Sequence, residues 1–113
     1  MSVNSIVGNI ALKQTVSLLD RLERERPEAA DTQRDMASLA AVALRRVRDV
    51  LSSDAPAGAG EKMMLQALAG QLRARMGQWR RRSPREAAAM ETPVRETVRL
   101  LGVAASWVPG NKD

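Results

Sequence analysis

An arginine cluster is the feature of this sequence whose residue types and spacing best fit a definite chemistry. The segment 73–85 contains no acidic residue but holds six arginines: Arg73, Arg75, Arg80, Arg81, Arg82 and Arg85. Guanidinium groups stay charged at physiological pH and bind phosphate oxygens in pairs. The cluster therefore indicates a surface for phosphate, as found in nucleic acids and lipid headgroups. A second interpretation stays open, because the preference for Arg over Lys is also what GC-rich coding produces.

The net charge of +5 is concentrated in the second half of the chain. Residues 1–60 carry eight basic and eight acidic groups, so that half is neutral. Residues 61–113 carry ten basic and five acidic groups, and the whole excess lies there. The distribution points to the second half as the part that meets an anionic partner.

The sequence lacks most of the residue types that catalytic sites use. The chain has no Cys and no His, which removes thiolate ligands, the commonest metal ligand and the commonest general base. No phosphate-binding glycine loop and no Ser-x-x-Lys motif occurs, and the acidic residues are interspersed with arginines as on solvated helices. We therefore expect a protein that is not an enzyme and that uses no metal and no cofactor.

The length and composition indicate one all-α domain. A chain of 113 residues is the size of a single domain, taken here as 1–113, either as a whole protein or as a domain of a longer one. It is rich in Ala, Leu, Met, Arg and Glu and lacks Phe and Tyr, which favours helices over strands. No signal peptide and no run of about 20 apolar residues is present. We expect a cytoplasmic protein, or one delivered to a host cell as a peripheral membrane protein.

Apolar periodicity predicts three helices in the first three quarters of the chain. The first helix is expected from Ser5 to about Arg26, where Pro27 stops it, with a stripe of Ile6, Ile10, Leu12, Val16, Leu19 and Leu22. The second begins near Asp31 and ends near Leu51, with a stripe of Met36, Leu39, Ala40, Ala43, Val47, Val50 and Leu51. After the loop 52–60, the third begins at Glu61 and ends near Arg82, with a stripe of Leu65, Leu68, Leu72, Met76 and Trp79.

The fourth helix has the clearest start signal in the chain. Ser83 is suited to be the N-cap, Pro84 the first helical residue and Glu86 the partner in a capping box. Pro93 is expected to kink or split this helix, which continues to about Val108. Its inner face is expected to contain Val94, Val98, Leu101 and either Ala104 or Trp107. Four such segments joined by short connections predict an up-down four-helix bundle.

In an up-down bundle, the first and third connections lie at the same end. We expect that end to gather basic residues around exposed apolar ones and to form the anion-binding site, made of Arg21, Leu22, Arg24, Arg26, Trp79, Arg80, Arg81, Arg82 and Arg85. Glu23, Glu25 and Glu28 offset part of that charge. Trp79 has an alternative role, because its spacing of seven from Leu72 is also that of a core residue.

A bundle with basic and apolar residues at this end resembles the membrane-localisation domains of bacterial toxins and of effectors delivered to host cells. The residues that carry the resemblance are Arg21-Leu22-x-Arg24-x-Arg26 and Gln78-Trp79-Arg80-Arg81-Arg82. The resemblance implies a targeting module that docks on phosphoinositide or phosphatidylserine through this end.

Two other functions compete with docking on an anionic membrane. Non-specific nucleic-acid binding requires the arginines to form a stripe along the third helix rather than an end cluster. A protein–protein adaptor, chaperone or homodimer is favoured by adaptable methionines such as Met63, which is expected to be exposed opposite Leu72. The position of the arginines therefore separates the first two functions.

Overall fold

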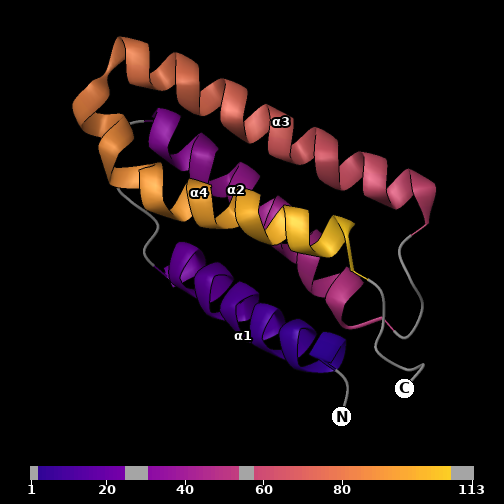
Figure 1. The fold of residues 1–113 in the computed structure, drawn as a ribbon. Helices are drawn as coiled ribbons and strands as arrows, with labels where there is room; N and C mark the ends of the chain where they lie inside the picture. The colour runs from indigo at the N-terminus through magenta and orange to yellow at the C-terminus, as the bar shows by residue number, and fades with distance from the viewer. Residues whose placement is uncertain (1–2, 25–30, 54–57, 108–113) are drawn as a thin grey trace.

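Four antiparallel helices make up the fold. The computed structural model describes residues 3–24, 31–53 and 58–107. The helices are α1 Val3–Arg24, α2 Asp31–Leu51, α3 Ala59–Arg82 and α4 Pro84–Ala105. Figure 1 shows that α1 ends and α2 begins at the same end of the bundle at which α3 passes into α4. The prediction of an all-α, up-down four-helix bundle is confirmed.

The helices are not arranged as a square. Helix α4 packs on α2 and α3, and α2 also packs on α1, so α2 and α4 form the centre (Figure 1). Helix α1 has little contact with α4, and over the described ranges it does not contact α3. The result is a slab of 49 × 26 × 17 Å with α1 and α3 at its two edges.

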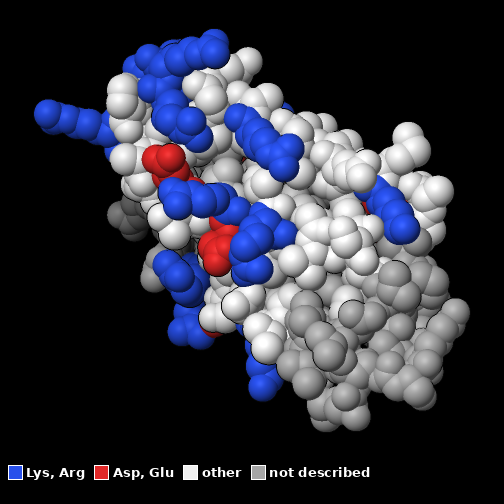
Figure 2. All heavy atoms as spheres, viewed as in Figure 1, with Lys and Arg blue, Asp and Glu red and all other residues white. Residues whose placement is uncertain are grey.

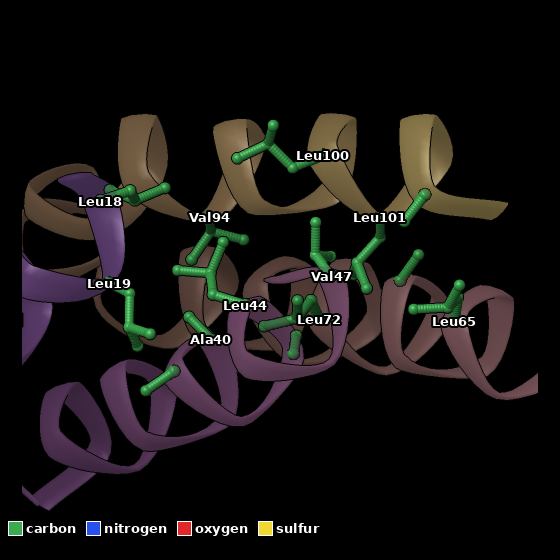
Figure 3. Close-up of a cluster of buried hydrophobic side chains, with 14 of the residues drawn as sticks. Leu18, Leu19, Ala40, Leu44, Val47, Leu65, Leu72, Val94, Leu100 and Leu101 are labelled. Carbon is green, nitrogen blue, oxygen red and sulfur yellow. The ribbon is translucent and has the colours of Figure 1, made fainter. Parts of the chain in front are cut away.

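An aliphatic core fills the space between the helices. Figure 3 shows leucine, valine and alanine side chains from all four helices converging, with Leu44, Leu72 and Leu101 at most 1% exposed. The predicted stripes of α2, α3 and α4 point inward, because their apolar residues recur at the helical period. Burial of this aliphatic surface is the main stabilising contribution to the fold.

The predicted stripe of α1 is wrong in part. Ile10 and Val16 are 52% and 47% exposed, whereas Ala11, Thr15 and Leu18 face the core. The large apolar residues determine a sequence-based stripe, but in α1 the smaller residues Ala11 and Thr15 are buried instead of Ile10 and Val16. The Thr15 hydroxyl is satisfied within its own helix, where it donates to the Ala11 carbonyl oxygen at 2.7 Å.

Helix α4 starts at the residue predicted but without the predicted cap. Ser83 is the single residue between α3 and α4, and Pro84 is the first residue of α4, yet the Ser83 side chain makes no capping hydrogen bond. The helix passes through Pro93 without a break, so the proline does not split it. Figure 1 shows a change of direction in its first half, which is the kink expected where proline removes a backbone bond.

Besides its core face, α1 is attached to the rest of the bundle by side-chain hydrogen bonds and by a ring contact. Arg45 of α2 donates to Glu23 at 3.0 Å, and Arg99 of α4 donates to Gln14 at 2.6 Å. The indole of Trp107, just after α4, lies directly on Gly8. A Cβ at Gly8 would stand 2.7 and 2.8 Å from the indole Cζ2 and Cζ3, so only glycine leaves room for the ring.

Candidate anion-binding surface

A basic tip lies where α3 turns into α4. We define it by Arg80, Arg81, Arg82 and Arg85, which are all exposed. Within the described ranges, Arg80 is the one member of the tip with a carboxylate in ion-pair range, and its Nε lies 3.9 Å from Glu91 Oε1. Arg81, Arg82 and Arg85 have no carboxylate in ion-pair range within the described ranges. Their guanidinium groups are therefore available to an external anion.

Helix electrostatics explain only part of this tip. Arg80, Arg81 and Arg82 occupy the last turn of α3, where the carbonyl end of the helix dipole favours positive charge. Arg85 lies in the first turn of α4, where the dipole favours negative charge. The helix dipole therefore explains the positive charge of three of the arginines. Arg85, in contrast, places a positive charge where the dipole disfavours one.

The residues predicted from α1 do not join this tip. Leu22 is half-buried between α1 and α2, and Arg24 pairs with Asp20 one turn earlier. Helix α1 occupies the edge opposite α3, so its arginines share an end of the bundle with the basic tip but not a site. Arg26 lies outside the described residues.

Trp79 is a core residue and not a surface anchor. Its side chain is 2% exposed and belongs to the hydrophobic core cluster. Its indole Nε1 is buried and has no hydrogen-bond partner among the described residues. The prediction that Trp79 offers an apolar anchor at the tip is therefore wrong, and the alternative based on its spacing from Leu72 is correct. The basic tip is left with charge as its means of binding.

Basic residues continue from the tip onto the broad side of the slab formed by α4. Arg95 and Arg99 are exposed one turn apart on α4. Arg73 of α3 lines a small groove together with Val98 and Gly102 of α4, which places it on the same side. Figure 2 shows this side, with blue side chains running from the tip across it and red ones lying among them. The positive surface is thus larger than the tip.

A groove between α1 and α4 extends this surface further. It has a volume of about 340 Å³, and Leu18 and Leu100 are among its lining residues. Lys13 and Arg21 line it from α1, and Glu96 lines it from α4. Arg21, predicted as part of the tip, is therefore a member of the broad side. We call Lys13, Arg21, Arg73, Arg80, Arg95 and Arg99 together the α4 face.

The acidic residues on the α4 face are partly neutralised by arginines. Glu96 accepts a hydrogen bond from Arg99 Nε at 2.7 Å, and Glu91 lies near Arg80. The opposite broad side, formed by α2, alternates charges instead, and Arg48 there lies 3.6 Å from Asp49. Six basic groups against two carboxylates make the α4 face positive.

Sequence reasoning missed Lys13, Arg95 and Arg99. They are scattered along two helices, so no local cluster marks them. The i,i+4 spacing of Arg95 and Arg99 was visible, but its meaning depends on α4 having an outward side. The packing of α4 on α2 and α3 shows which side that is.

Other kinds of site find no support within the described ranges. No group of three or more carboxylates there could hold a metal ion. No helix of that part of the chain is long and apolar enough to cross a membrane. A second groove, of about 240 Å³ between α1 and α2, is lined by Ala37 and Ala41 and carries both signs of charge at Glu23 and Arg45.

No protein-family model, no curated protein and no solved structure matches this chain.

Proposed function

We propose that this protein is a non-enzymatic targeting module that docks on anionic phospholipid surfaces through the basic tip. The observation that carries the proposal is the group of exposed arginines across the turn between α3 and α4, of which Arg81, Arg82 and Arg85 have no carboxylate partner in the described ranges. Phosphoinositide and phosphatidylserine headgroups offer the phosphate and carboxylate oxygens that guanidinium groups bind. No cofactor or metal enters this function.

The concentration of arginines at one end of α3 favours a membrane over nucleic acid as the partner. A stripe along α3 would require exposed basic groups along its whole length, yet between Lys62 and Arg73 the helix has no charged residue. The arginines gather instead at the C-terminal end of α3 and continue onto α4. This arrangement fits a surface that meets the end and one side of the bundle.

The expected strength of docking follows from the charge alone. Each arginine close to an anionic leaflet contributes about 1 kcal/mol, so the four arginines of the tip contribute about 4 kcal/mol. That amounts to roughly a thousandfold enrichment at the surface. Because Trp79 is buried, no aromatic side chain of the described tip adds to it. Docking is thus expected to be reversible and to weaken steeply with salt.

The test is co-sedimentation with vesicles. Wild type should sediment with vesicles that contain phosphatidylserine or phosphoinositide but not with neutral vesicles. The variant Arg80→Glu/Arg81→Glu/Arg82→Glu should lose at least a hundredfold in partitioning, because it removes three contributions of about 1 kcal/mol and adds three repulsive ones. The three residues are exposed, so circular dichroism should show an unchanged fold.

A matched variant controls for net charge. Arg46→Glu/Arg48→Glu/Arg75→Glu reverses three exposed arginines away from the tip and changes the net charge by the same six units, from +5 to −1. It should retain most of the binding. Equal losses in both variants, or no binding of wild type at moderate salt, would contradict the proposal. Duplex DNA measured alongside should bind more weakly than anionic vesicles.

A second candidate function is contact with a protein partner or a second copy of the chain. Met63 is 69% exposed, as predicted, and Met64 is 43% exposed. Both lie near the start of α3, away from the basic tip. If this pair forms a dimer contact, sedimentation equilibrium should show a dimer that Met63→Gln/Met64→Gln dissociates. A monomeric wild type would remove the homodimer from consideration.

A further inference from the structure

We infer that the protein lies side-on against an anionic phospholipid bilayer, with the α4 face as the larger part of the contact surface. The inference rests on the proposed function, and it adds an orientation and a second set of binding residues. The predicted contact was an end-on one, made by the loops at one end of the bundle.

The attraction that the four tip arginines provide is a reason to expect a larger contact surface. Four arginines without an apolar anchor give a reversible enrichment of roughly a thousandfold, and stable peripheral binding usually needs a second contribution. The α4 face provides it, because Arg73 and Arg95 are exposed and have no carboxylate in ion-pair range within the described ranges. Lys13 and Arg21 continue the positive charge onto α1.

The shape of the molecule fits the same orientation. The bundle is a slab 17 Å thick whose broad side measures 49 × 26 Å. A planar surface meets more of such a molecule on its broad side than on its end. Both contacts are compatible, because Arg80, whose Nε lies 3.9 Å from Glu91 Oε1 of α4, belongs to both the basic tip and the α4 face.

Screening makes the two broad sides electrostatically independent. The Debye length is about 8–10 Å at physiological ionic strength, which is shorter than the 17 Å thickness of the slab. Charges on the α2 side therefore interact weakly with a bilayer that contacts the α4 face. Two variants with the same net charge, altered on opposite sides, should then differ in binding.

The experiment compares two double variants in the vesicle assay. Arg73→Glu/Arg95→Glu alters the α4 face. Arg75→Glu/Arg46→Glu alters exposed positions elsewhere: Arg75 lies about 200° around α3 from Arg73, and Arg46 is on the outer side of α2. Both lower the net charge by four units, and neither touches the basic tip.

The two variants should give clearly different results. Loss of each arginine is expected to reduce partitioning about fivefold, so the α4-face variant should bind at least about 25-fold more weakly than wild type. The other variant should change by less than about threefold. Equal effects of the two, together with loss of binding in the tip triple variant, would overturn the side-on orientation and leave the proposed function standing. Failure of wild type to bind would overturn both.

A second readout reports orientation without changing a charge. The chain has no cysteine, so single cysteines can carry an environment-sensitive fluorophore. Thr92 is exposed on α4, and Ser38 is exposed on α2. On addition of phosphatidylserine vesicles, the label on Thr92→Cys should shift to the blue and that on Ser38→Cys should not. Unchanged emission at Thr92 under conditions where the protein sediments with vesicles would contradict side-on contact.

Discussion

Replacing Trp79 with alanine is expected to lower the free energy of unfolding by about 3–5 kcal/mol, as for other large aromatic side chains truncated in a core. The indole is 2% exposed and lies in the hydrophobic core, so truncation leaves a cavity near the end of the bundle. Domains of this size are stabilised by only about 5–15 kcal/mol. Urea unfolding followed by circular dichroism measures the change.

Trp79→Phe is the matched control. It keeps an aromatic ring, and it removes an indole N–H that has no partner among the described residues, so no hydrogen bond is lost. The loss should be about 1–2 kcal/mol, from the smaller ring alone. A loss below 1 kcal/mol for Trp79→Ala, with Trp79 fluorescence that shifts to the blue on vesicle binding, would mean that the ring is a surface anchor after all.

Gly8→Ala is expected to destabilise the protein by about 1–2 kcal/mol, although alanine is normally better than glycine inside a helix by about 1 kcal/mol. The new methyl group would occupy the space of the Trp107 indole, which must move off α1 and lose part of its burial. Trp107 is only 9% exposed in the folded protein. Its fluorescence, recorded in a Trp79→Phe background, should shift to the red.

A double-mutant cycle tests the cause of that effect. In a Trp107→Ala background the ring is absent, so Gly8→Ala should regain its ordinary helical advantage and stabilise the protein by about 1 kcal/mol. The reversal of sign corresponds to a coupling of about 2–3 kcal/mol, within the range measured for residues in contact. Additive effects of the two substitutions would show that Gly8 and Trp107 do not depend on each other.

Much of the fold could be predicted from local signals. Pro84 after Ser83 predicted the start of α4 correctly, and the periodic apolar residues of α2 and α3 identified their buried sides correctly. The Ser83 side-chain cap was wrong, because the N-cap position alone does not determine where a hydroxyl points. The stripe of α1 was wrong in part, because Ala11 and Thr15 face the core while the larger Ile10 and Val16 remain exposed.

The residues of the candidate site were harder to predict, because their grouping depends on how the helices pack. The chain order predicts which connections share an end, but not which helices touch across it, and α1 and α3 turned out to occupy opposite edges. Of the arginines predicted from α1, Arg21 lines the groove between α1 and α4, and Arg24 pairs with Asp20. Trp79 could be assigned only after its burial was known, because seven-residue spacing fits both of its roles. The partners of Gly8 and Arg99 lie far away in the sequence.

The single residue between α3 and α4 bears on how the chain folds. These two helices share the most extensive contact in the bundle, and Ser83 alone joins them. Bringing them together requires almost no loop closure, so this hairpin should form early, in the fast regime of proteins with local contacts. Helix α2 leaves the ribosome before either of them, and the part of its apolar surface that packs on α3 and α4 stays uncovered until the hairpin has been synthesised. During that interval the nascent chain exposes the surface that chaperones recognise.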